Sequence, residues 1–142
     1  MKISARNVFE GTITSVKEGS ISAEVELKLA TGETLVAGIT EGSVRSLGLA
    51  VGKKAQAIVK APLVLLATHT EGWKFTARNQ LTGKVSALQK GAVNASVTVK
   101  LAGGASLASI VTNGAIDDLA LAVGSPVTAL FKADSVVLAV HG

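Results

Sequence analysis

Cysteine is absent from the 142-residue chain, and its aromatic residues are three phenylalanines and one tryptophan. Without thiols the chain has neither a disulfide framework nor a thiolate metal site. So few aromatic side chains do not make the stacking surface by which many proteins bind single-stranded nucleic acid. These shortages argue against a disulfide-rich scaffold and against a reader of nucleic acid.

Long apolar runs and a strong charge of either sign are also missing. Hydrophobic residues make up 48% of the chain, but no run approaches the roughly 18 residues that a bilayer-spanning helix needs. The start, Met1 to Ile3, has no apolar stretch of the secretory type, so we expect a cytoplasmic protein without a membrane partner. The net charge is only +4 and is spread along the chain. Such a charge suits small anions better than a polyanion.

What the chain does have is an internal repeat. Residues 4–67 align without a gap on residues 76–139, and 25 of the 64 aligned positions are identical. The repeat divides the chain into two units of roughly 70 residues, each near the lower limit for burying a useful core. We therefore expect a first domain over residues 1–67, a linker over 68–74 and a second domain over 75–142.

Each repeat has the pattern of short strands separated by turns. In the first repeat, residues 21–29 alternate apolar and polar side chains, which predicts a strand with one buried face. Thr40 is placed to cap a helical turn over residues 41–47, and Gly48 can end that turn in the left-handed conformation. The other predicted strands of this repeat cover residues 8–16, 34–40, 55–60 and 63–67.

The fold class that follows is all-β. Five short strands, turns at regular spacing and one helical turn before the fourth strand are typical of a small antiparallel barrel of the oligonucleotide/oligosaccharide-binding (OB) type. The sequence therefore predicts two tandem OB-like five-stranded antiparallel barrels, each with a short helical turn.

Three polar features recur at equivalent positions of the two repeats. They are the pairs Arg6 and Arg78, Thr40 and Thr112, and Lys60 and Lys132. Four acids of the first repeat become neutral in the second: Glu24, Glu26, Glu33 and Glu41. Two cations that are kept while nearby acids are lost suggest that their counter-ion comes from outside the chain.

A site built from these groups would present only hydrogen-bond donors. Hydrogen phosphate carries a proton near neutral pH and needs an acceptor in the wall, whereas sulfate, molybdate and tungstate are fully deprotonated. Such a site therefore disfavours phosphate, because the phosphate proton would be left without a partner. The sequence predicts a site for a proton-free tetrahedral dianion.

The combined motifs resemble the molybdate-binding Mop domain, or molbindin, family in its tandem two-domain form. The resemblance is carried by the Ser-Ala-Arg-Asn start, two glycine turns (Gly-Ser-Ile-Ser-Ala and Gly-Ala-Val-Asn-Ala), an Ile-Thr-x-x-Ser helix start and a Lys-Ala-Pro strand end, and it covers nearly the whole chain. It implies an OB-like barrel per repeat, a homotrimer, molybdate or tungstate as ligand without a cofactor, oxyanions held at domain and subunit interfaces, and a role in intracellular storage.

The resemblance also implies which residues bind the oxyanion. In the first repeat they are Ser4, Ala5, Arg6, Thr40, Ser43, Lys60 and Ala61, and in the second Thr76, Ala77, Arg78, Thr112, Lys132 and Ala133. Ala115 stands where the family has a serine, so the second site is expected to lose a hydroxyl. The resemblance implies a further set of backbone amides that hold anions near the threefold axis of the trimer, here called the axial set. These amides lie around two glycine turns: Gly19, Ser20, Ile21 and Ser22, with Gly91, Ala92, Val93 and Asn94.

Plainer interpretations compete with these assignments. Lys60 can reach solvent along its own stem, Arg6 can tie a strand edge to a carboxylate, and the glycine turns can be ordinary hairpins. An enzyme is not predicted, because His69 and His141 lie in the linker and the tail and no nucleophile is paired with a base. The alternative function is a nucleic-acid-binding OB module.

Overall fold

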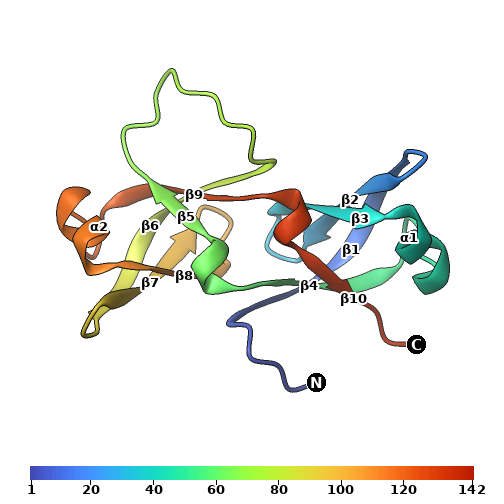
Figure 1. Cartoon of the computed structure of the whole chain (residues 1–142), viewed down its shortest axis with the longest axis horizontal. Coiled ribbons are helices and arrows are strands. Elements are labelled where there is room, and N and C mark those ends of the chain that lie inside the picture. Colours follow the sequence, from blue (N-terminus) through green and yellow to red (C-terminus); the bar gives the residue numbers. More distant parts are fainter. The chain divides into compact units, whose positions relative to one another are not determined.

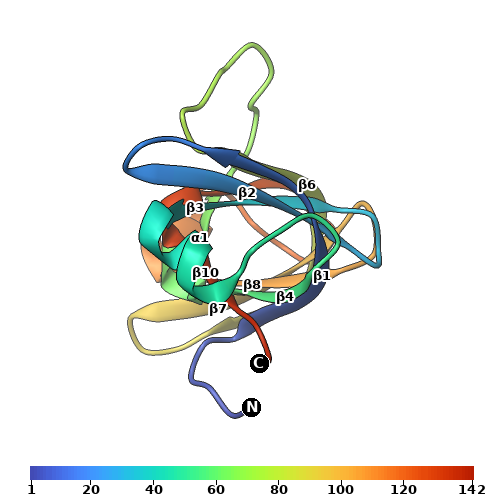
Figure 2. The ribbon, with the colours of Figure 1, turned by 90° about the vertical axis from the view of Figure 1, so that its right-hand side faces the viewer.

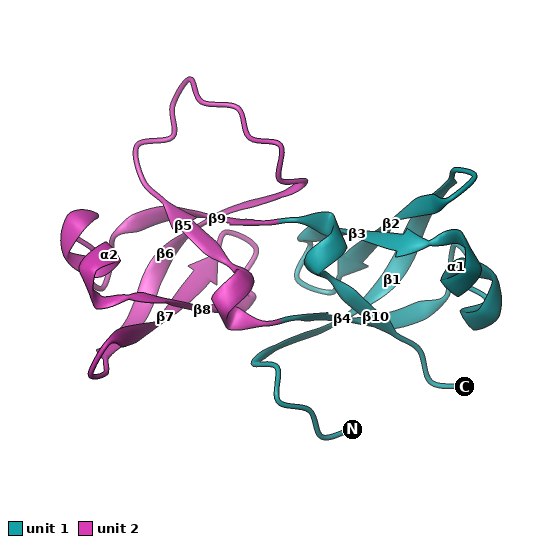
Figure 3. Ribbon diagram, in the orientation of Figure 1, with its two compact units in different colours: residues 1–59, 132–142 teal, residues 60–131 magenta.

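The computed structural model describes all 142 residues, which fall into two compact units (Figure 3). Unit 1 consists of residues 1–59 and 132–142, and unit 2 of residues 60–131. Each unit is built on one five-stranded antiparallel sheet. Neither the two short α-helices nor any other helix has the length and apolar character that crossing a bilayer requires.

The sheet of unit 1 has the strand order β10-β4-β1-β2-β3 (Figure 1). It curves around the core of the unit, and α1 lies at one end of the curved sheet (Figure 2). In chain order the elements of unit 1 are β1 (Asn7–Glu18), β2 (Ser22–Leu29), β3 (Thr34–Thr40), α1 (Glu41–Leu47), β4 (Lys54–Val59), the 3-10 turn η2 (Ala133–Ser135) and β10 (Val137–Ala139).

The sheet of unit 2 repeats this arrangement in the order β5-β9-β6-β7-β8. Its elements are the 3-10 turn η1 (Ala61–Leu63), β5 (Leu65–Ala67), β6 (Asn79–Lys90), β7 (Asn94–Leu101), β8 (Ser106–Thr112), α2 (Asn113–Asp118) and β9 (Pro126–Phe131). Both long first strands carry a bulge, which bends the strand and increases the local twist. The all-β prediction of two tandem five-stranded OB-like barrels is confirmed, as partly open sheets.

The two repeats exchange their last strands. β5 of the first repeat pairs with β9 in unit 2, where Leu66 lies opposite Ala129. β10 of the second repeat pairs with β4 in unit 1, where Leu138 lies opposite Ala57. The compact units therefore differ from the expected sequence ranges. The reason is that the two end segments carry the same apolar pattern and fit either sheet, so their sequence does not specify the partner.

The buried faces of the strands form the core of each unit. Along β2, Val25 and Leu27 are fully buried and Lys28 is exposed, as the alternation predicted. Ile21, which belongs to the same apolar set, lies outside the strand and is 83% exposed, so the prediction was wrong for this residue. The exchanged strands complete both cores, because Leu66 and Leu138 are buried.

The helical turn is capped as expected. The amide of Ser43 donates to Thr40 Oγ1 at 3.2 Å, and Gly48 follows α1 with φ of 61°. The equivalent of Gly48 in unit 2 is Ala120, which has φ of 50°. A β-carbon is costly in this left-handed conformation, by roughly 1–2 kcal/mol. Unit 2 thus repeats the helix end of unit 1 without the residue that favours it.

Candidate anion-binding site

The strand exchange regroups the residues that the sequence assigned to the anion. Unit 1 contains Ser4, Ala5, Arg6, Thr40 and Ser43 of the first repeat together with Lys132 and Ala133 of the second. Unit 2 contains Thr76, Ala77, Arg78 and Thr112 of the second repeat together with Lys60 and Ala61 of the first. Each unit therefore holds an arginine, a capping threonine and a lysine, but these come from different repeats.

In unit 1 the segment with the lysine packs closely on β3. A β-carbon added to Gly38 would lie 3.3 Å from the backbone nitrogen of Asp134 and 3.5 Å from the carbonyl carbon of Ala133. Such a contact is tight, so the absence of a side chain at Gly38 lets η2 approach the strand. Since β3 ends at Thr40, this packing holds the Lys132 segment beside the strand that carries the capping threonine.

In unit 2 the equivalent docking uses a buried hydroxyl. Ser109 on β8 is fully buried, and its Oγ donates a 2.7 Å hydrogen bond to the backbone carbonyl of Val64. This bond fixes the segment that follows Lys60 against the strand that ends at Thr112. The role of Ser109 was not predicted from the sequence. The signal was a serine on the inward face of a strand, at the position where the first repeat has Ala37.

The two capping threonines differ in how they use their hydroxyl protons. Thr40 Oγ1 donates to Ser43 Oγ at 2.9 Å, so Ser43 keeps the hydroxyl donor that remains available in unit 1. Thr112 Oγ1 accepts from the amide of Ala115 at 3.0 Å, and no acceptor inside the chain takes its proton. Besides the exposed hydroxyls of Ser4 in unit 1 and Thr76 in unit 2, the capping region of each unit therefore offers one hydroxyl donor. Alanine at position 115 moves that donor to Thr112 and does not remove it.

The cationic side chains of both sets reach solvent. Lys60 and Lys132 are exposed, and no ion pair is formed by Lys60. Lys132 Nζ lies 4.0 Å from Asp134 Oδ2, and both side chains are about three-quarters exposed, so this pair stabilises the fold little. The expectation that the retained cations lack internal acids thus holds for Lys60 and fails for Lys132. Ala61 and Ala133 are buried, so only their backbone could reach an anion.

The glycine turns expected to hold axial anions form closed hairpins. The amide of Gly19 donates to the carbonyl of Ser22 at 2.9 Å, and the amide of Gly91 donates to the carbonyl of Asn94 at 2.7 Å. These two amides are therefore already used. The remaining residues of both turns, Ser20, Ile21, Ala92 and Val93, are exposed.

The residue that follows each capping threonine also contacts its turn. The amide of Glu41 donates to the carbonyl of Ile21 at 3.0 Å, and Asn113 Nδ2 donates to the carbonyl of Gly91 at 2.9 Å. The turn of unit 1 therefore has a carboxylate-bearing neighbour, whereas the turn of unit 2 has a neutral amide. A carboxylate repels an anion, so the unit 2 turn is electrostatically the more favourable.

No group of three or more histidine, aspartate or glutamate side chains gathers where a metal ion could be held. What each unit does present is a partly open β-barrel with hydroxyls and cationic side chains at its strand ends. These features define a class of protein built from two β-barrel modules in one chain.

Comparison with known families identifies the modules. The model of the TOBE domain matches residues 3–66 and again residues 76–138. The chain belongs to the TOBE domain family and carries the domain twice. The family is not an enzyme family. The matched ranges follow the sequence repeats, whereas the compact units follow the exchanged strands.

Relatives of known structure or function cover nearly the whole chain. A crystal structure of the cytoplasmic molybdate-binding protein ModG with molybdate bound is 50% identical, superimposes with a TM-score of 0.95, and covers 99% of this chain and 100% of that one. The molybdenum transport protein ModE of Herbaspirillum seropedicae is 41% identical over 99% of this chain, and the molybdenum-pterin-binding protein MopA of Rhodobacter capsulatus is 42% identical over 98%. The chain spans about half the length of these last two, 52% in each case.

These relatives confirm the resemblance to the Mop family that the motifs carried. They do not favour the nucleic-acid-binding alternative for these domains. One relative, from Escherichia coli K12, is a DNA-binding regulator, and this chain matches 52% of its length.

Proposed function

We propose that the protein binds molybdate, and its analogue tungstate, as the intact dianion. The observation that carries the proposal is the match to molybdate-bound ModG over the whole chain at 50% identity. A molybdate ligand also fits the chemistry of the two residue sets, each of which combines cationic side chains with hydroxyl donors.

The anion would be held by the residues that each unit gathers. In unit 1 these are Ser4, Ala5, Arg6, Ser43, Lys132 and Ala133, with Thr40 orienting Ser43. In unit 2 they are Thr76, Ala77, Arg78, Thr112, Lys60 and Ala61. Hydrogen bonds from charged donors are each worth roughly 1.5–3 kcal/mol. Two cations per set therefore provide most of the binding energy, and the hydroxyls provide orientation.

We further propose that copies of the chain assemble as a homotrimer that completes these sites. Support comes from apolar side chains that are exposed at equivalent positions in both repeats. They are the pairs Ile21 and Val93, Val51 and Val123, and Leu65 and Val137, each between 59% and 83% exposed. Exposed apolar residues that recur in both units indicate a surface that is covered in an assembly. The proposed role is storage of the oxyanion in the cytoplasm.

Isothermal titration calorimetry of the purified protein tests the proposal. Molybdate and tungstate should bind with saturable heats, sulfate more weakly because its smaller ion makes fewer simultaneous contacts, and phosphate least because its proton lacks an acceptor. Equal heats for all four anions, or no heat for molybdate, would refute the proposal.

Native mass spectrometry with molybdate tests the assembly independently, since the mass gives both the number of chains and the number of bound ions. A gel shift with single-stranded oligonucleotides at low salt tests the alternative function. Strong salt-dependent retardation would favour nucleic-acid binding.

A further inference from the structure

A second type of hollow occurs at the same place in both units, outside the residue sets described above. In unit 1 it has a volume of about 500 Å³ and lies beside Gly11 on β1. In unit 2 it has a volume of about 420 Å³ and lies beside the equivalent Gly83 on β6. A β-carbon at Gly83 would clash with the backbone carbonyl oxygen of Lys100, so only glycine permits this close strand approach.

The hollow of unit 2 places two lysines next to each other. Lys84 on β6 and Lys100 on β7 are directly opposite in the antiparallel register, and both are exposed lining residues. Like charges directly opposite each other destabilise a sheet. Neither lysine has a carboxylate partner, and unit 2 contains six Lys and Arg residues against three Asp and Glu. No acid lines this hollow; Glu71 lines an adjacent one that shares Thr82, Gly83 and Pro126 with it.

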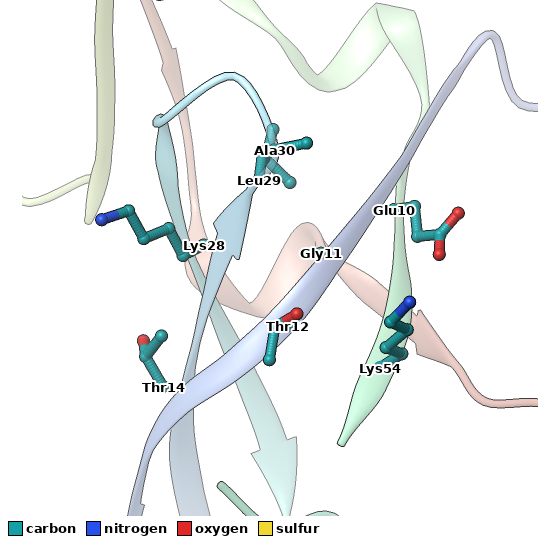
Figure 4. A pocket seen from close by; sticks show the side chains of 8 residues that line it. All are labelled: Glu10, Gly11, Thr12, Thr14, Lys28, Leu29, Ala30 and Lys54. Carbon is teal, nitrogen blue, oxygen red and sulfur yellow. The ribbon is translucent and has the colours of Figure 1, made fainter. Parts of the chain in front are cut away.

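The hollow of unit 1 also has two lysines, arranged differently. Figure 4 shows Lys28 and Lys54 on opposite sides of β1, with Thr12 on the strand between them. The carboxylate of Glu10 extends on the same side of β1 as Lys54. There it would compete with a bound anion for the ammonium group of Lys54. Unit 2 has Thr82 in place of this glutamate. The unit 2 hollow is therefore the more favourable for a negatively charged ligand.

The size and lining of the unit 2 hollow indicate an organic ligand. A volume of about 420 Å³ lies in the roughly 300–1,000 Å³ range of pockets that hold small organic molecules. A bare tetrahedral oxyanion would leave most of it empty. Apart from the lysines, the exposed side chains of Ala102 and Pro126 make part of the lining apolar, whereas the side chain of Leu101 is buried in the core. Lysine binds phosphate groups as a point charge, so two adjacent lysines suit a phosphate dianion.

We propose that this hollow binds a small organic phosphate. The phosphate lies between the ammonium groups of Lys84 and Lys100, and the body of the ligand packs against Pro126 and Ala102, whose side chains are exposed. The site is separate from the residues assigned to molybdate, so its occupation does not depend on the proposed function.

Nitrogen–proton NMR spectra of the intact protein, titrated with AMP as the probe, test the inference. AMP should shift the amides of residues 82–84 and 100–102 with saturation at or below about 10 mM, which corresponds to a binding free energy near −3 kcal/mol. Adenosine, which lacks the phosphate, should shift them at least fivefold less effectively. Inorganic phosphate should also bind at least fivefold more weakly than AMP, because it lacks the apolar body.

Lys84→Gln and Lys100→Gln should each weaken AMP binding about fivefold or more, and the double variant should abolish it. Lys74→Gln is the matched control, because it removes the same charge from an exposed lysine of the same unit. Molybdate titration of the same variants should be unchanged. Absence of saturable AMP shifts, equal binding of adenosine, or an equal effect of Lys74→Gln would overturn the inference. Inorganic phosphate binding as tightly as AMP would do so as well.

Discussion

Ser109 Oγ and the carbonyl oxygen of Val64 are joined by a 2.7 Å hydrogen bond across 45 residues of sequence. Val64 and Ser109 belong to different repeats but to the same compact unit. The bond satisfies a buried hydroxyl and holds the exchanged segment on β8. In unit 1 the equivalent position is Ala37, and there the close approach at Gly38 replaces the bond.

Ser109→Ala should lower the free energy of unfolding of unit 2 by about 1–3 kcal/mol, because it leaves a buried carbonyl without its donor. Chemical denaturation measures the loss, and hydrogen exchange should show faster exchange at β5. Ser106→Ala, on the exposed start of the same strand, is the control and should change stability by less than about 0.5 kcal/mol. Equal effects of both substitutions would show that the hydrogen bond between Ser109 and Val64 does not stabilise unit 2.

Removal of residues 132–142 should damage unit 1, although these residues belong to the second repeat. The deletion takes away β10 and the buried side chains of Val136 and Leu138, each worth roughly 1.5–3 kcal/mol. Hydrogen exchange should show lost protection in β4, where β10 pairs, and retained protection in β9. Lost protection in β9 with β4 unchanged would contradict the strand exchange.

Ala120→Gly should stabilise unit 2 by about 0.5–1 kcal/mol, because it relieves a left-handed alanine, partly offset by the added freedom of the unfolded chain. The reciprocal change, Gly48→Ala, should destabilise unit 1 by about 1 kcal/mol or more for the same reason. Thermal unfolding monitored by circular dichroism shows whether each variant is more or less stable than the unchanged protein. A loss of stability in Ala120→Gly would show that the conformation is not strained.

Ser43→Ala should weaken molybdate binding less than about threefold. Without Ser43 Oγ, the proton of Thr40 becomes available, and unit 1 acquires the arrangement of unit 2. Thr112→Val should weaken binding in unit 2 about 2- to 12-fold, the equivalent of a hydrogen bond of 0.5–1.5 kcal/mol. Calorimetry separates the two, with Thr112→Ser as a variant that keeps the hydroxyl. A larger effect of Ser43→Ala than of Thr112→Val would be incompatible with the assigned donors.

Arg6→Ala and Lys60→Ala should each weaken molybdate binding about 10-fold or more, because each removes a charged donor worth roughly 1.5–3 kcal/mol. The barrels should remain folded, since both side chains are exposed. Lys17→Ala removes an equally exposed charge from β1 and serves as the control. Unchanged affinity in both test variants would return these residues to the plainer roles of solvent contact and strand-edge pairing.

The sequence predicted most of the local structure correctly, for identifiable physical reasons. The alternation along residues 21–29 fixed the buried face of β2, and Thr40 with Gly48 fixed both ends of α1. The strand exchange was beyond it, because the segments at Leu66 and Leu138 have equivalent patterns and pairing is decided by the path of the chain. The regrouping of the site residues follows from that exchange and was missed with it.

Several details depend on contacts that single positions do not encode. Ala120 is left-handed because it follows α2 at the position where Gly48 follows α1 in unit 1. The redistribution of the hydroxyl donor between Thr112 and Ser43 depends on the rotamer of the threonine. The assignment of the site residues to a bound oxyanion remains a prediction.

The loop over residues 68–74 connects two repeats that exchange their last strands. Proteolytic cleavage in this loop should therefore leave the two fragments associated. The N-terminal fragment would still supply β5 to unit 2, and the C-terminal fragment would still supply β10 to unit 1. A cleaved molecule should therefore migrate as two bands in a denaturing gel but elute as one species in size-exclusion chromatography under native conditions. The reason is that each barrel needs a strand from both fragments.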